Sequence, residues 1–279
     1  MKSFLRRFAR NYGALFGVLI FLVVVFLAAT ASVFYEESPW NMVAAPLVAP
    51  FTDAALPFGT DMLGRDLTAG MLYGARVSLL VGVVSTVVAL VLGILVGAVA
   101  GYSGGRIDDA LMRFTEFFQT IPQLAMAVVI VAIFSPSVVT IVGAIAVVSW
   151  PPVARLVRAE FMSLKQREFV QAAVVIGQKP LRIILTQILP NALSPIIVTA
   201  SFMVATAILT ESSLSFLGLG DRNMMSWGFM IGASRTMLRE AWWMSVWPGV
   251  AILLTVLAIN LIGEGLNDAL NPQLRKRGE

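Results

Sequence analysis

The stretch VSLLVGVVSTVVALVLGILVGAVA, from Val77 to Ala100, decides the fold class of this chain. It contains no charged side chain over its whole length. A helix rises about 1.5 Å per residue and the hydrocarbon core of a bilayer is about 30 Å thick, so about 20 apolar residues cross it. The stretch therefore predicts a membrane-spanning helix.

Five further apolar stretches of similar length lie on either side of this one. Of the 279 residues, 58% are hydrophobic and only 13% are charged, whereas soluble domains are about a quarter charged. The sequence predicts an all-α, polytopic membrane protein with one transmembrane domain over residues 1–279. We expect its six spans at residues 12–34, 77–100, 114–134, 138–157, 192–217 and 243–266.

The first span has a second interpretation. Four cations precede it and Ala29-Thr30-Ala31 ends it, as in a cleavable signal peptide. The apolar run from Gly13 to Ala31 is, however, longer than the usual signal core of about 7–15 residues. We interpret it as an uncleaved span; cleavage would leave five spans and change nothing else.

The distribution of cations predicts the orientation. With a cytoplasmic N-terminus, 15 of the 20 Lys and Arg residues fall on the inner side, as the positive-inside rule requires. Both termini are then cytoplasmic, residues 35–76 form a periplasmic loop, and residues 158–191 form a cytoplasmic loop. Because the cations of this +4 chain lie beside the spans, we expect the lipid bilayer as a partner and no nucleic acid.

Small residues and acids give local expectations within the spans. Gly93, Gly97 and Gly101 recur every four residues, which predicts a face where two helix backbones approach closely. Pro122 and Pro136 are expected to interrupt or end the third span. The acids Glu116, Glu211, Glu264 and Asp268 lie near span ends, where we expect solvated or capping roles rather than a proton pathway.

Several kinds of chemistry are excluded by missing residues. The chain has no cysteine and no histidine, which removes thiolate chemistry, the commonest general base and the commonest transition-metal ligand. No lysine follows a glycine, so there is no phosphate loop. We therefore expect no catalytic or metal site, and no cofactor bound by the chain itself.

The stretch REFVQAAVVIGQKPLRIILTQILPNALSP, from Arg167 to Pro195, is too polar to span a membrane and too apolar for an ordinary loop. The spacing predicts a helix over 167–176, with Phe169, Ala172, Ala173 and Ile176 on one apolar face. Gly177 supplies its stop, and a second helical piece is expected over 181–189. The residues alone fit two roles equally well: docking into a groove on another protein, or resting on lipid headgroups.

A resemblance to a known family favours docking. Gln171-Ala172-Ala173, then Gly177, then Leu189-Pro190 resembles the Glu-Ala-Ala loop of ATP-binding-cassette importer permeases. Glu168 belongs to the similar stretch just upstream. The resemblance implies that this helix docks on an ATP-hydrolysing subunit and couples its closure to the spans. Gln171 stands where the motif has glutamate, which keeps the size and hydrogen bonding but loses the charge.

A narrower resemblance covers nearly the whole chain. The segments that carry it are Pro57–Asp61, Leu63–Asp66, Tyr73–Leu79, Gly101–Tyr102 with Gly104, Gly105 and Asp108, Glu211–Gly218 and Gly265–Pro272. They are similar to the peptide/nickel (oligopeptide/dipeptide) group of these permeases, and to the shorter "C-type" subunit of each pair.

This resemblance implies a bacterial inner-membrane transport subunit that is not itself an enzyme. The implied partners are a second homologous permease subunit in a heterodimer, ATP-binding subunits that hold ATP and Mg, and a periplasmic or extracytoplasmic substrate-binding protein.

Two other functions compete with that of an importer permease. An ion-gradient-driven secondary transporter would need acids near the membrane midplane and repeats between its halves, and the sequence shows neither. A scaffold without transport would leave the loop at 158–191 without a purpose. The substrate stays open between peptides, nickel complexes, and glutathione-like or opine-like solutes, and the sequence does not single out pore-lining residues.

Overall fold

The computed structural model describes residues 7–270, and these residues are helical apart from loops and two isolated β-bridges. This confirms the all-α fold class. In chain order the elements are α2 (Tyr12–Phe34), α3 (Leu67–Ser103), α4 (Gly105–Gln119), α5 (Gln123–Phe134), α6 (Val138–Lys165), α7 (Glu168–Val175), α8 (Pro180–Ile183), the π-turn η1 (Ile184–Ile188), α9 (Leu189–Leu214), the π-turn η2 (Ser215–Leu219), α10 (Trp227–Ser234) and α11 (Trp243–Leu270).

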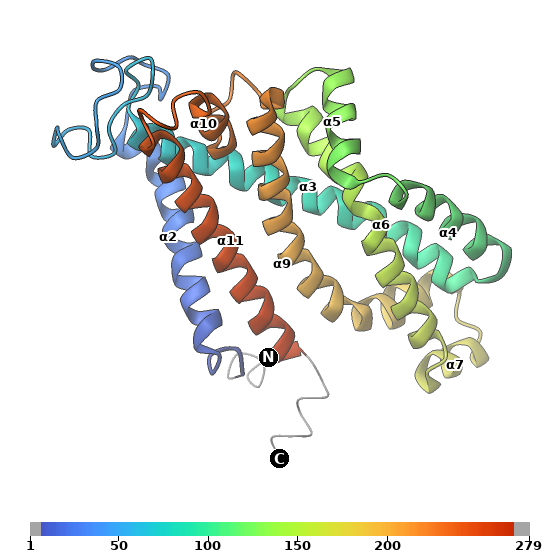
Figure 1. The fold of residues 1–279 in the computed structure, drawn as a ribbon. Helices are drawn as coiled ribbons and strands as arrows, with labels where there is room; N and C mark the ends of the chain where they lie inside the picture. Colours follow the sequence, from blue (N-terminus) through green and yellow to red (C-terminus); the bar gives the residue numbers. More distant parts are fainter. Residues whose placement is uncertain (1–6, 271–279) are drawn as a thin grey trace.

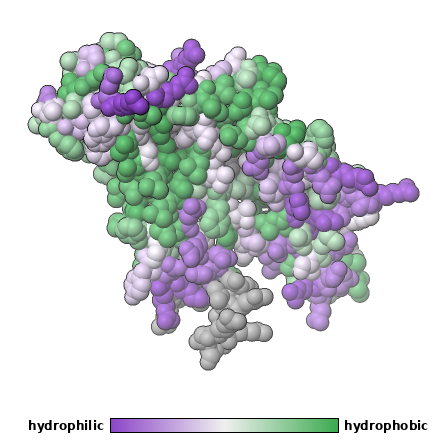
Figure 2. All heavy atoms as spheres, in the orientation of Figure 1, coloured by the Kyte–Doolittle hydropathy of each residue, from purple (hydrophilic) through white to green (hydrophobic). Residues whose placement is uncertain are grey.

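Five helical stretches are long and apolar enough to cross a membrane, or six if the bent pair α4–α5 is one span. Residues 35–66 and α10 form a cap at one end, and α2 begins and α11 ends at the opposite end (Figure 1). The helices therefore run from the cap to this opposite face. The surface over α2 and α11 is apolar along their middles, whereas hydrophilic surface gathers at the cap, at the opposite end and over α4 (Figure 2).

The third expected span, 114–134, is not one continuous helix. The helices α4 and α5 meet at 81° across a break of a few residues. Pro122 directly precedes α5 at φ −55° and ψ 127°, and a proline has no backbone N–H to continue the hydrogen bonds of α4. Pro122, which was expected to interrupt the third span, thus separates two helices. Of these, α4 is charged along one face.

Three other segments extend beyond the expected bounds. Helix α3 begins at Leu67 rather than 77, because Asp66 caps it by accepting a 2.7 Å hydrogen bond from the Thr68 N–H. Helix α6 continues to Lys165, past the expected end at 157. The helical stretch of the fifth span starts at Pro180 rather than 192. The loops at 35–76 and 158–191 are accordingly shorter than expected.

The predicted glycine face is confirmed as the contact between α3 and α6. A Cβ added at Gly93 would lie 2.5 Å from the Val153 Cβ, and one at Gly97 would lie 2.4 Å from the Ala154 carbonyl oxygen. At Gly101 the Arg158 carbonyl oxygen would be 2.7 Å away. The two backbones therefore pack at a distance that only glycine permits, which joins α3 and α6 into one rigid pair.

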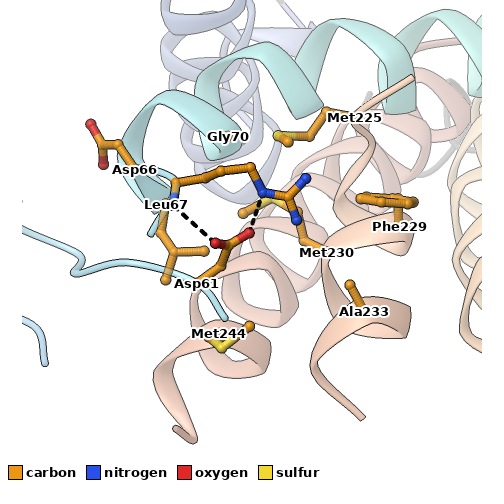
Figure 3. Close-up of a pocket in the computed structure, with 10 residues that line it drawn as sticks. Asp61, Asp66, Leu67, Gly70, Met225, Phe229, Met230, Ala233 and Met244 are labelled. Atoms are coloured by element: carbon orange, nitrogen blue, oxygen red, sulfur yellow. Dashed lines mark hydrogen bonds and ion pairs between the residues drawn. The ribbon is translucent and has the colours of Figure 1, made fainter. Parts of the chain in front are cut away.

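An ion pair between two residues of the cap, Asp61 and Arg65, stabilises its fold (Figure 3). Asp61 accepts hydrogen bonds from the backbone N–H groups of Leu63 and Arg65 and from the Arg65 side chain. A cavity of about 20 Å³ beside the pair, with Met230 of α10 and Met244 of α11 in its wall, has room for about one water molecule. Trp243 of α11 donates a 3.2 Å hydrogen bond from Nε1 to the Thr60 carbonyl oxygen, and the Trp40 ring meets that of Phe229 in α10 edge to face, so the cap is fastened to both helices.

Candidate functional site: the α7 segment

The helix α7 projects from the end of α6, on the face opposite the cap (Figure 1). The junction is fixed by side chains on both sides of it. Lys165 Nζ donates a 2.6 Å hydrogen bond to the Tyr102 carbonyl oxygen at the end of α3. Gln171 Nε2 donates a 2.8 Å hydrogen bond to the Lys165 carbonyl oxygen. The amide at the motif's glutamate position therefore caps the end of α6.

Gly177 ends α7 in the left-handed conformation that the sequence predicted, with φ at +76°. The Gln178 N–H donates to the Ala173 carbonyl oxygen at 3.1 Å, and the Gly177 N–H donates to that of Val174 at 2.9 Å. These two bonds form a Schellman motif. Nothing lies within 4 Å of a Cβ added at Gly177, so only the backbone conformation requires glycine there.

One face of α7 packs against the membrane-spanning helices. Val170 and Ala173 are buried, with exposed fractions of 0% and 5%. They belong to an apolar cluster to which α3, α6, α8, η1 and α9 all contribute. This face therefore connects α7 mechanically to three spans. The other buried members of the cluster are Ala98, Val153, Val157, Phe161, Ile183, Ile188, Ala192 and Ile196.

The opposite face of α7 is apolar and uncovered. Phe169 and Ala172 are exposed, Val175 is 85% exposed and Ile176 is 72% exposed. The sequence placed Ala173 on the same face as Phe169, Ala172 and Ile176, which is wrong, because Ala173 turns inward with Val170. The apolar residues of this short helix thus divide between a face packed on its own chain and a face open to a partner.

The remaining predicted site residues lie around this helix. Glu168 and Gln171 are exposed on α7. Leu189 packs at the edge of the same apolar cluster as Ala173, and Pro190 is exposed at the start of α9. The Leu189 N–H donates to the Ile184 carbonyl oxygen, which closes the π-turn η1 just before the proline. The structure therefore joins the two halves of the motif through one cluster.

The role expected for Glu211 is wrong. We expected a solvated or capping acid, but its exposed fraction is 2%. Its Oε1 accepts hydrogen bonds from the Ser215 hydroxyl at 2.8 Å and the Ser226 hydroxyl at 2.7 Å. The burial of Glu211 is caused by the helix α10, which the sequence did not predict. Gly228 of this helix lies against the Glu211 carboxylate. Glu116, Glu264 and Asp268 are exposed as expected.

The five or six helical stretches that are long and apolar enough to cross a bilayer define a polytopic membrane protein. Residues 93–276 match the family described as "Binding-protein-dependent transport system inner membrane component", and the chain belongs to this family. It is the permease subunit of an ATP-binding-cassette importer. The resemblance to the C-type permease subunits of the peptide/nickel group is confirmed.

Relatives match along nearly the whole chain. The di/tripeptide transport system permease protein DppC of Pseudomonas aeruginosa is 41% identical over 99% of this chain and 93% of its own length. The oligopeptide transport system permease protein OppC of Haemophilus influenzae is 38% identical over 97% of this chain and 88% of its own length. A chain of the MetNI methionine ABC transporter shares the fold, with a TM-score of 0.61 at 17% identity over 72% of this chain and 96% of that chain.

Proposed function

We propose that this chain forms half of a translocation pathway for peptides and couples that pathway to ATP hydrolysis by a partner subunit. The substrate class is supported by relatives whose names specify dipeptides, tripeptides or oligopeptides. The observation that carries the coupling is the division of α7 into two apolar faces. One face packs on α3, α6 and α9, and the other faces away from the chain.

The uncovered face of α7 suits a protein groove better than water. Val175 and Ile176 expose large apolar side chains beside charged neighbours such as Glu168, and exposed apolar patches rimmed by polar residues mark interaction sites. A groove on the ATP-binding subunit would cover them. We assign the coupling role to Glu168, Gln171, Ala172, Ala173, Gly177, Leu189 and Pro190.

The complete transporter would contain several chains. A second homologous permease subunit completes the pathway as a heterodimer, and ATP-binding subunits hold ATP and Mg, so this chain has no ATPase site of its own. A substrate-binding protein docks on the cap from the extracytoplasmic side of the bacterial inner membrane, and both termini are cytoplasmic. ATP-driven movement of α7 would switch the helices between two arrangements, which gives alternating access.

The docking proposal is tested by a single thiol. Because the chain has no cysteine, Val175→Cys places one thiol of this chain on the uncovered face of α7. Val139→Cys is the matched control, since Val139 is 81% exposed at the start of α6. We expect a short bifunctional reagent to join the Val175→Cys chain to an ATP-binding subunit in native membranes, and to leave the Val139→Cys chain unjoined to it.

Cross-linking of both variants, or of neither, would contradict docking at α7 and favour a helix that rests on lipid headgroups. The peptide part of the proposal has a separate test. Vesicles that contain the complete transporter, its binding protein and internal ATP should accumulate labelled trialanine, and they should not do so with ADP.

A further inference from the structure

A cavity of about 180 Å³ lies where α3, α5, α6 and α9 meet. Its walls come from the middles of the helices. Ser85 lies at the midpoint of α3, Ser149 and Pro152 flank the midpoint of α6, and Thr199 is at the midpoint of the helical stretch from Pro180 to Leu219. The cavity is therefore at the depth of the hydrocarbon core rather than at either end of the molecule.

The lining combines polar, uncharged side chains with a larger apolar area. Five hydroxyls and one amide contribute to it, and none of the described residues that line it is charged. The apolar part of the wall includes Met203, whose unbranched side chain adapts to differently shaped neighbours. Polar groups at this depth are costly unless they have partners. The polar side chains are Ser85, Thr86, Gln123, Ser149, Thr199 and Thr206.

Most of these polar groups lack a partner within the described part of the chain. The Thr86 and Thr206 hydroxyls donate to the Gly82 and Phe202 carbonyl oxygens of their own helices. The Ser85 hydroxyl is fully buried and makes no hydrogen bond to any described residue. No hydrogen bond joins the side chains of Gln123, Ser149 or Thr199 to residues 7–270 either. The Gln123 side chain is exposed and Ser149 and Thr199 are partly exposed, so their hydrogen-bonding capacity is free for a molecule inside the cavity, whereas the Ser85 hydroxyl lies behind the wall.

The regular hydrogen bonding of α6 is interrupted beside this wall. Pro151 and Pro152 lie inside this helix, and a proline cannot donate to the carbonyl four residues earlier. The carbonyl groups of Val147 and Val148 are therefore released from the regular helical pattern next to Ser149. Such breaks persist inside a membrane where the freed groups face protein or a water-filled space.

We infer that this cavity is a solute-contact site of the translocation pathway, and that it binds the backbone amide groups of a passing peptide. An amide both donates and accepts, as hydroxyl and carboxamide side chains do. A lining without charges binds the feature common to all peptides and offers no counter-ion to a particular side chain. Gln123, Pro152 and Thr206 are exposed and line the cavity, so it opens to the outside of this chain. The inference rests on the proposed function.

The test uses the complete transporter in vesicles with its binding protein, internal ATP and labelled trialanine. The double variant Ser149→Ala/Thr199→Val removes two partly exposed hydroxyls of the cavity wall with little change of shape. Loss of one neutral hydrogen bond slows passage about fivefold, so we expect the maximal uptake rate to fall about tenfold or more. Thr30→Val is the matched control, because Thr30 lies on α2 and donates to the Phe26 carbonyl oxygen.

Uptake by the double variant within twofold of wild type would overturn the inference. A second measurement covers a variant that does not assemble. Ser149→Cys and Thr199→Cys should react with a sulfonate-bearing thiol reagent and should be protected by trialanine with ATP, whereas Leu22→Cys, at a 59% exposed position on α2, should not react. If the two new thiols were as unreactive as the thiol of Leu22→Cys, both with and without trialanine and ATP, the inference would be overturned too. A wild-type transporter that takes up no trialanine overturns the proposed function instead.

Discussion

Arg158 of α6 and Asp108 of α4 form a two-pronged ion pair. Arg158 Nε donates to Asp108 Oδ1 at 2.5 Å, and Arg158 Nη2 donates to Oδ2 at 2.6 Å. Asp108 is buried, and the backbone of Arg158 lies against Gly101 near the end of α3. The pair therefore fastens the first turn of α4 where the chain leaves the glycine-packed pair of helices.

Asp108→Asn should destabilise this corner. The variant keeps the side-chain shape, but the amide nitrogen of asparagine cannot accept from Arg158. One of the two hydrogen bonds is therefore lost, and the other loses the carboxylate charge. We expect a loss of about 1–3 kcal/mol in the free energy of unfolding, since the Arg158 side chain is partly exposed and the pair partly screened. Thermal unfolding of the purified complex would measure it. Asp109→Asn, at the exposed neighbour, should change the melting temperature little; equal shifts would refute the assignment.

Gly97→Ala tests the contact between α3 and α6. The new methyl group would lie 2.4 Å from the Ala154 carbonyl oxygen, and forcing apart a packed contact costs about 1–3 kcal/mol. We expect a lower melting temperature and a lower yield of the assembled complex. Gly143→Ala is the control on α6, because nothing lies within 4 Å of a Cβ there. A Gly97→Ala protein as stable as Gly143→Ala would show that the helices separate readily.

Gly177→Leu should uncouple ATP hydrolysis from uptake while the chain still inserts. Leucine resists the left-handed conformation at this position, by about 1–2 kcal/mol, so the end of α7 should unwind. We expect peptide uptake and peptide-stimulated hydrolysis in vesicles to fall together. Gly177→Asn should retain both, because asparagine tolerates this conformation. Normal stimulated hydrolysis in the leucine variant would contradict the coupling role.

Glu211→Ala should weaken the attachment of α10 to α9. Ser226 donates to Glu211 and also accepts from the Phe229 N–H as the N-cap of α10. Removal of the carboxylate leaves two buried hydroxyls without their acceptor, which costs about 1–3 kcal/mol. The melting temperature should fall, and proteolysis near α10 should become faster. Ser213→Ala, which removes an exposed hydroxyl from α9, should change neither.

Features that depend on local sequence were predictable. Helix α2 occupies the expected segment 12–34, because its hydropathy is uniform and Asn11 caps its start. The stop at Gly177 and the glycine face of α3 follow from the conformational freedom and small size of one residue type. The family motif likewise requires only short spacings along the chain.

Features that depend on how the helices are rotated against one another were not predictable from the sequence. Pro122 indicates a break but not an angle of 81°. The short helix α10 has too few residues for a periodic signal, and without it the burial of Glu211 has no apparent cause. The cavity around Ser85 collects side chains from four helices. Each of these helices also exposes apolar faces, so the sequence alone does not show which faces meet.

The helical stretch from Pro180 to Leu219 has a mechanical consequence. Its 40 residues would measure about 60 Å along their axis, twice the thickness of the hydrocarbon core. One end curves toward α7 and the other end reaches α10 (Figure 1). The stretch runs from α8 through η1 and α9 to η2 without an intervening loop, so it works as a bent lever. Turning such a lever by about 10° around its middle moves each tip by about 5 Å, which is enough to open or shut a passage for a small molecule.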